Sequence, residues 1–228
     1  MTPARSEPTV RRKSRQTVHS SGCLSGFLLP PLVALCFGVL LAFVTIRDPE
    51  SKSHASAAPF TSNGMIAPLF TIEVQFWAAR IAAWSAEHGI DPNLAATVMQ
   101  IESCGDPSAR SIAGAAGLFQ VMPYHFQEHE KAYDPNTNAL RGLDYLRRSL
   151  ERANDDPRLA LAGYNGGIGV IGRAETGWAA ETRRYAYWGS GIYADAQQNA
   201  AESARLNEWL AAGGASLCKK ARQRLGLP

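Results

Sequence analysis

A single glutamate, Glu102, ends an apolar stretch of the sequence, and its carboxyl group could take part in catalysis. Leu94, Val98 and Ile101 lie at helical spacing before it. Burial disfavours a charged carboxylate, and the negative end of a helix dipole acts in the same direction, so we expect a pKa raised by about two units. Such a protonated carboxyl could act as a general acid on a glycosidic oxygen. The alternative is a solvated glutamate that caps the helix end.

Two later stretches carry polar side chains beside glycines. In "SIAGAAGLFQVMP" (111–123), Gln120 could offer a hydrogen-bond donor and an acceptor to an amide such as an N-acetyl group. In "ALAGYNGG" (160–167), Tyr164 and Asn165 end a predicted helix at a glycine turn. Taken singly, each of these residues is also typical of a core or a turn.

Together with "ETRRYAYW" (181–188), these stretches resemble the soluble lytic transglycosylase family. The family pattern has Glu-Ser, Gly-Leu-Met-Gln, Ala-Tyr-Asn and Glu-Thr-x-x-Tyr in this order. The corresponding residues here are Glu102-Ser103, Gly117-Leu118-Phe119-Gln120, Gly163-Tyr164-Asn165 and Glu181-Thr182-Arg183-Arg184-Tyr185. Phe119 replaces methionine and Gly163 replaces alanine. The resemblance covers about residues 72–190.

The resemblance implies a lysozyme-like catalytic domain that acts on peptidoglycan without a metal or cofactor. It makes Glu102 the catalytic acid. The sugar-binding residues that it implies are Ser111, Gln120, Met122, Tyr164, Asn165 and Tyr185. In the implied reaction, the N-acetyl carbonyl of the muramic sugar attacks its own anomeric carbon. Glu102 acts first as acid and then as base, which produces a 1,6-anhydro sugar.

Two other functions remain open at this stage. A muramidase or chitinase on the same fold would use water in place of the sugar 6-hydroxyl. A membrane-tethered protein could also bind peptidoglycan without cleaving it. Most glycosidases need a second carboxylate, but Asp106 is typical of a turn, and Glu128 and Glu130 lie in the polar run "QEHE". The sequence does not distinguish endo from exo cleavage, nor does it indicate the biological process or the oligomeric state.

Helical patterns dominate the sequence from residue 69 onward and predict an all-α domain over 69–228, with a C-terminal helical extension. Asp91-Pro92 and Asp134-Pro135 are typical helix starts. The predicted helices cover 72–89, 91–103, 134–153, 155–167, 181–188 and 201–214.

The N-terminal region predicts export of this domain. Residues 22–46 carry no charge and, at about 1.5 Å per residue, could cross a hydrocarbon core of about 30 Å. We therefore predict a basic cytoplasmic tail over 1–22, a transmembrane anchor over 23–46 and a flexible linker over 47–68. A cleaved signal sequence is the alternative, because "HASA" (54–57) offers a cleavage site. The domain would then be secreted rather than held at the cell membrane.

The charge distribution argues against nucleic acid as a partner. The first 22 residues carry five basic residues and one acidic residue, and the rest of the chain carries 18 basic and 19 acidic residues. A nucleic-acid-binding domain is expected to have a basic face. The predicted partners are peptidoglycan glycan strands and, through the N-terminal helix, the membrane. No protein partner is indicated.

The four cysteines divide between the two regions. Cys23 and Cys36 lie in the apolar segment, and Cys104 and Cys218 lie in the part that we expect to be exported. Disulfides persist in oxidising compartments, so we predict a Cys104–Cys218 bond. The alternative is two separate buried thiols.

Overall fold

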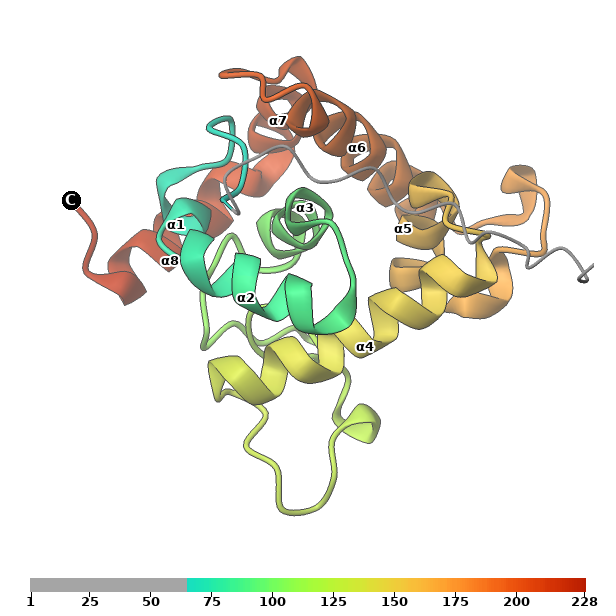
Figure 1. Cartoon of the computed structure of the whole chain (residues 1–228), viewed down its shortest axis with the longest axis horizontal. Coiled ribbons are helices and arrows are strands. Elements are labelled where there is room, and N and C mark those ends of the chain that lie inside the picture. Colours follow the sequence, from blue (N-terminus) through green and yellow to red (C-terminus); the bar gives the residue numbers. More distant parts are fainter. Residues whose placement is uncertain (1–64) are drawn as a thin grey trace, which may run out of the picture. The chain divides into compact units, whose positions relative to one another are not determined.

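Helices make up most of residues 65–228, the part of the chain that the computed structural model describes (Figure 1). No strand is assigned within these residues, so the prediction of a mainly helical domain is confirmed. The predicted tail, the anchor or signal segment and linker residues 47–64 lie outside them. Within 65–228, no helix combines the length and the apolar character that crossing a membrane requires.

Three helices begin with an aspartate followed by a proline, namely α3 (Pro92–Glu102), α4 (Pro135–Arg152) and α5 (Pro157–Gly166). The carboxylates of Asp91, Asp134 and Asp156 each accept a hydrogen bond from a backbone N–H in the first turn. The proline has no N–H to satisfy, so it fits the first helical position. The starts predicted at Asp91 and Asp134 are confirmed.

The predicted helix over 72–89 is interrupted and forms α1 (Ile72–Gln75) and α2 (Ala78–His88). Trp77 lies at the break with φ −94° and ψ 0°, and its indole N–H donates to the Gly105 carbonyl at 2.9 Å. Val74 before the break and Ile81 and Trp84 after it are nevertheless all buried.

The C-terminal part is more helical than predicted. α6 (Ala180–Gln197) continues nine residues beyond the expected 181–188. After α7 (Ala204–Trp209) and a wide turn over Leu210–Gly214, the chain forms α8 (Ala215–Leu225). α8 lies in the predicted helical extension but beyond the last individual helix that the sequence predicted.

α3 is the central helix, and it positions the site. Every residue from Pro92 to Gln100 is buried. α1, α2 and α6 pack directly against α3, and α4 packs on α2 and α5, as the crossing helices in Figure 1 show. Glu102 is the residue at which this buried helix leaves the core.

The chain between α3 and α4, residues 103–134, is mostly irregular and extends below the helices in Figure 1. Two isolated bridges, Arg110 with Ala116 and Ala116 with Val121, fold its first part back on itself. This segment contains the residues that follow the predicted acid, from Ser111 to Met122.

Candidate active site

Glu102 is half-buried at the C-terminal end of α3, and its surroundings favour the protonated form. Burial raises the pKa of Glu102 to about 8, and the negative charge of Glu181 adds to this effect, while an interaction with the Tyr185 hydroxyl opposes it. The rise is larger than the two units expected from the sequence. Glu102 is therefore mostly protonated at neutral pH, as a general acid must be.

Tyr164 of α5 and Tyr185 of α6 lie beside Glu102. Burial and the charge of Glu102 raise the pKa of both tyrosine hydroxyls well above the ordinary value, so both remain protonated. The Tyr164 hydroxyl donates to the Phe119 carbonyl at 2.7 Å. The buried Tyr185 hydroxyl has no partner within hydrogen-bonding geometry, so its contact with Glu102 is looser than a formed hydrogen bond. It remains a donor for an ionised Glu102.

Ser103 ties the end of α3 to the segment that follows. Its hydroxyl donates to the Leu118 carbonyl at 2.7 Å and accepts from the Gly105 backbone N–H at 3.1 Å. Ser103 is fully buried, so water competes little for these hydrogen bonds. The bond to Leu118 links the residue after Glu102 to the segment that contains Gln120.

Gln120 has fewer free hydrogen-bonding groups for a ligand than the sequence suggested. Its side-chain nitrogen donates to the carbonyls of Ala109 at 3.1 Å and Gly117 at 3.0 Å. Its backbone is held in the left-handed region at φ +46°, which is uncommon for a residue other than glycine. The nitrogen donors thus stabilise the loop, and the carbonyl oxygen is the group that remains for a ligand N–H.

Ser111, Met122 and Asn165, the other sugar-binding residues that the resemblance implies, make local contacts. The Ser111 hydroxyl accepts from the Ala115 backbone N–H at 2.9 Å, and half-buried Met122 directly precedes a short 3₁₀ helix over Pro123–His125. The Asn165 carbonyl oxygen accepts from the Thr182 hydroxyl at 2.9 Å, which joins α5 to α6. Within residues 65–228, no hydrogen bond connects Ser111, Met122 or Asn165 to Glu102 itself.

The two departures from the family pattern both face the core. Phe119 is fully buried, and its ring meets Trp84 edge-on at 6.4 Å between centroids. Gly142 of α4 makes room for it, because a Cβ there would lie 2.5 Å from the Phe119 Cβ. A Cβ at Gly163 would strike the Ser149 hydroxyl and the Ile171 side chain. Both substitutions are therefore explained by packing against α4 and the chain after α5.

Other acidic residues have structural partners. The Asp106 carboxylate accepts from the Ser108 backbone N–H at 2.8 Å, as expected of a turn residue. Glu130 accepts two hydrogen bonds from Arg141, at 2.8 and 2.6 Å, and this guanidinium lowers the pKa of Glu130 to about 2. Glu130 is thus ionised at any working pH and does not resemble a second catalytic acid.

Cys104 and Cys218 form the predicted disulfide, with their α-carbons 5.0 Å apart and 114 positions apart in sequence. The bond joins α8 to the turn directly after Glu102. Buried Glu73 lies close to both sulfur atoms, so the three side chains are near enough to one another to bind a metal ion. They do not suit a metal, because the sulfur atoms are bonded to each other and Glu73 pairs with Arg222.

Sequence reasoning missed two residues that shape the site. Asn138 accepts from the Phe119 backbone N–H at 2.8 Å and donates to the Ala116 carbonyl at 2.7 Å. The sequence feature that could have revealed Asn138 is its spacing, because it lies four residues before Gly142 and eight before Leu146 on the buried side of α4. Glu181 was noted only as part of a motif, although it is the carboxylate whose charge raises the pKa of Glu102.

Comparison with known proteins agrees with this geometry. Residues 79–186 match the family model described as the transglycosylase SLT domain. The match takes in just under half of the chain. The resemblance to soluble lytic transglycosylases is thereby confirmed. The matched residues include Glu102, the disulfide partner Cys104, Gln120, Tyr164 and Tyr185.

Two relatives illustrate the extent of the similarity. A transglycosylase of Enterobacteria phage PRD1 is 39% identical over 111 residues, which are 48% of this chain and 40% of the relative. Membrane-bound lytic murein transglycosylase C of Mannheimia succiniciproducens is 27% identical over 139 residues, which are 52% of this chain and 39% of the relative. The chain thus matches less than half the length of each relative.

Among solved structures, an inactive mutant of lytic transglycosylase Slt from Pseudomonas aeruginosa is similar over 68% of this chain and 26% of that chain. Its TM-score is 0.40 and its sequence identity 20%.

Proposed function

We propose that this protein is a peptidoglycan lytic transglycosylase that cleaves the β-1,4 bond between N-acetylmuramic acid and N-acetylglucosamine. The observation that carries the proposal is Glu102, whose pKa burial raises to about 8 within an SLT domain. The names of the relatives, which include membrane-bound lytic murein transglycosylases, support the same substrate.

In the proposed reaction, protonated Glu102 donates its proton to the glycosidic oxygen as the bond to the anomeric carbon breaks. The substrate's acetamido carbonyl oxygen bonds to that carbon and forms an oxazolinium ring. Glu102, now a carboxylate, removes the proton of the 6-hydroxyl, and the sugar O6 attacks the anomeric carbon and opens the ring. The products are a 1,6-anhydro-muramic end and a glucosamine with a free 4-hydroxyl, so no water is consumed.

The neighbouring side chains suit these two stages. Burial favours the neutral acid of the first stage, and the Tyr185 hydroxyl can donate to the carboxylate of the second. The Gln120 carbonyl oxygen, which the loop leaves unused, could accept the acetamido N–H and so orient the carbonyl towards the anomeric carbon. Ser111, Met122, Asn165 and Tyr164 would line the sugar.

We also propose that the domain works outside the cytoplasm, attached through the predicted N-terminal helix or secreted after its cleavage. The Cys104–Cys218 bond supports an oxidising compartment.

Mass spectrometry of the fragments released from purified cell wall tests the activity. A lytic transglycosylase releases anhydro-muropeptides, which are lighter by one water than the products of a muramidase. Reducing-end products would favour the hydrolase on the same fold. If the protein bound cell wall but released nothing, the non-catalytic alternative would replace both.

A further inference from the structure

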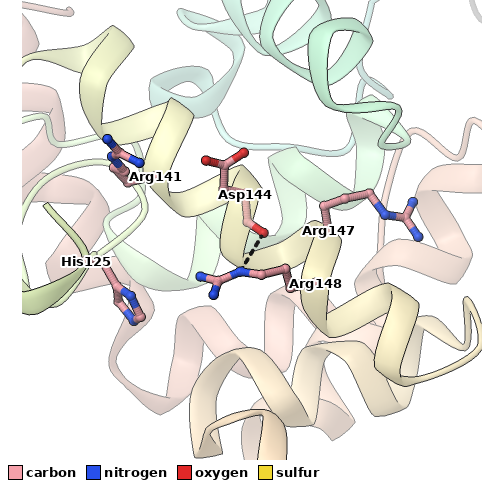
Figure 2. Close-up of a pocket in the computed structure, with 5 residues that line it drawn as sticks. All are labelled: His125, Arg141, Asp144, Arg147 and Arg148. Atoms are coloured by element: carbon pink, nitrogen blue, oxygen red, sulfur yellow. Dashed lines mark hydrogen bonds between the residues drawn. The ribbon is translucent and has the colours of Figure 1, made fainter.

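A pocket of about 340 Å³ lies beside α4 and is lined by charged side chains that do not include Glu102 (Figure 2). Its lining residues are His125, Arg141, Asp144, Arg147 and Arg148. None of them belongs to the motifs that identify the family.

Most of these charges are already balanced. The Arg141 guanidinium pairs with Glu130 at 2.6 Å, and the Arg147 guanidinium pairs with Asp155 at 2.6 Å. The Asp144 carboxylate lies 3.4 Å from the His88 ring, a contact that balances its charge only when His88 is protonated. An incoming anion would gain little from Arg141 or Arg147, because each already has a carboxylate partner.

Arg148 is the exception. It is exposed and takes part in no ion pair within residues 65–228. Its Nε donates to the Asp144 backbone carbonyl at 3.4 Å, and the guanidinium carbon lies 5.2 Å from the centre of the Tyr145 ring. In Figure 2 the guanidinium extends towards His125, while Arg147 extends the other way. Its two terminal nitrogens make no hydrogen bond within residues 65–228 and are available for a ligand.

His125 supplies a second donor beside it. Burial and the charge of Arg148 lower the pKa of His125, so the ring is neutral at neutral pH and carries one N–H. The ring lies 4.8 Å from that of Tyr145, so both donors adjoin the same tyrosine. A planar guanidinium and an adjacent N–H match the oxygens of a carboxylate.

The pocket is connected to the active site by a row of aromatic rings. Tyr145 meets Tyr164 edge-on at 5.6 Å between centroids, and Tyr164 lies beside Glu102. Tyr145, which contacts Arg148, is thus one ring contact away from the tyrosine beside Glu102, and a long substrate could reach both places. The proposed peptidoglycan substrate carries carboxylates, on its stem peptides and, where the peptide is absent, on the lactyl group of muramic acid.

We propose that Arg148 and His125 form a subsite for a substrate carboxylate. This proposal rests on the peptidoglycan function proposed above and assigns a specificity-determining role to residues outside the family motifs. Arg148 acts by binding, not by chemistry at the scissile bond.

The test measures binding to the full-length chain by calorimetry, in a Glu102→Gln background that prevents turnover. Three ligands separate the sources of the carboxylate: peptide-bearing glycan strands, strands stripped of peptide that retain the lactyl carboxylate, and a chitooligosaccharide with neither. Arg148→Gln is compared with Arg152→Gln, which removes an equally exposed charge from the same helix.

We expect Arg148→Gln to raise the Kd for peptide-bearing strands roughly tenfold, as loss of a charge-assisted contact should. The chitooligosaccharide should bind unchanged, and Arg152→Gln should have no effect. An effect on the stripped strands alone would assign the subsite to the lactyl carboxylate, and an equal effect on both kinds of strand would show that it accepts either carboxylate. An unchanged Kd for all ligands, or the same loss for all three, would overturn the subsite alone. Failure of every variant, including the Arg152 control, to bind any glycan would overturn the proposed function with it.

Discussion

The Arg222 guanidinium donates a hydrogen bond from Nε to the Glu73 carboxylate at 2.6 Å, which joins α8 to α1 across 149 positions. The Glu73 side chain is completely buried, and the Arg222 side chain is 45% exposed. The pair lies beside the Cys104–Cys218 disulfide. α8 lies beyond the part of the chain that matches the family model, yet it is attached both to the start of the domain and to the turn after Glu102.

Arg222→Ala should lower the free energy of unfolding by about 1–3 kcal/mol, because it leaves a buried acceptor without its partner. Denaturant unfolding followed by circular dichroism measures this. Arg224→Ala is the matched control, since that side chain is 60% exposed and lies 3.9 Å from Asp106. Equal effects of the two changes would show that the Glu73 contact contributes nothing specific.

Replacing both cysteines, as Cys104→Ser/Cys218→Ser, should leave a folded protein that melts earlier. The bond closes a loop of more than a hundred residues, which corresponds to at most about 4–5 kcal/mol in the chain-entropy model. Activity should fall less than in Glu102→Gln, because the disulfide supports the site without touching substrate. Thiol labelling of the denatured, unreduced protein checks the bond directly, and labelling of both Cys104 and Cys218 would contradict it.

Glu102→Gln should abolish release of muropeptides while glycan binding and folding persist. The amide preserves the shape of the side chain but can neither give nor take the proton. Glu128→Gln, at an exposed position, serves as the control. If the Glu102 variant kept more than a tenth of the parent rate, the general acid would have to be another residue.

The raised pKa of Glu102 also predicts how stability depends on pH. The folded-state pKa is about 8 and the unfolded value 4.5. Between these values the unfolded chain releases the proton that the folded state keeps, so stability falls as pH rises from 4.5 to 8 and then levels off.

Glu102→Gln lacks this decline. The free energy of unfolding of the variant, relative to that of the parent, should therefore rise by about a few kcal/mol between pH 4.5 and 9. Urea unfolding of both proteins at several pH values measures the difference. A constant difference across this range would mean that Glu102 is not desolvated as described.

The sequence by itself determined the features that depend on neighbouring residues. Asp91 and Asp134 predicted helix starts because an N-cap needs a side chain and an N–H a few residues apart. The order of short motifs identified the family and Glu102. The Cys104–Cys218 pair followed from the small number of cysteines in the part predicted to be exported.

The tertiary structure decided the features that depend on residues far apart in the chain. The break at Trp77 and the role of α8 involve contacts with Gly105 and Glu73 that no local pattern encodes. The pKa of Glu102 depends on α6, whose Tyr185 and Glu181 lie about eighty positions away. Local spacing can predict where a carboxyl stands on a helix, but its protonation depends on what the whole fold packs around it.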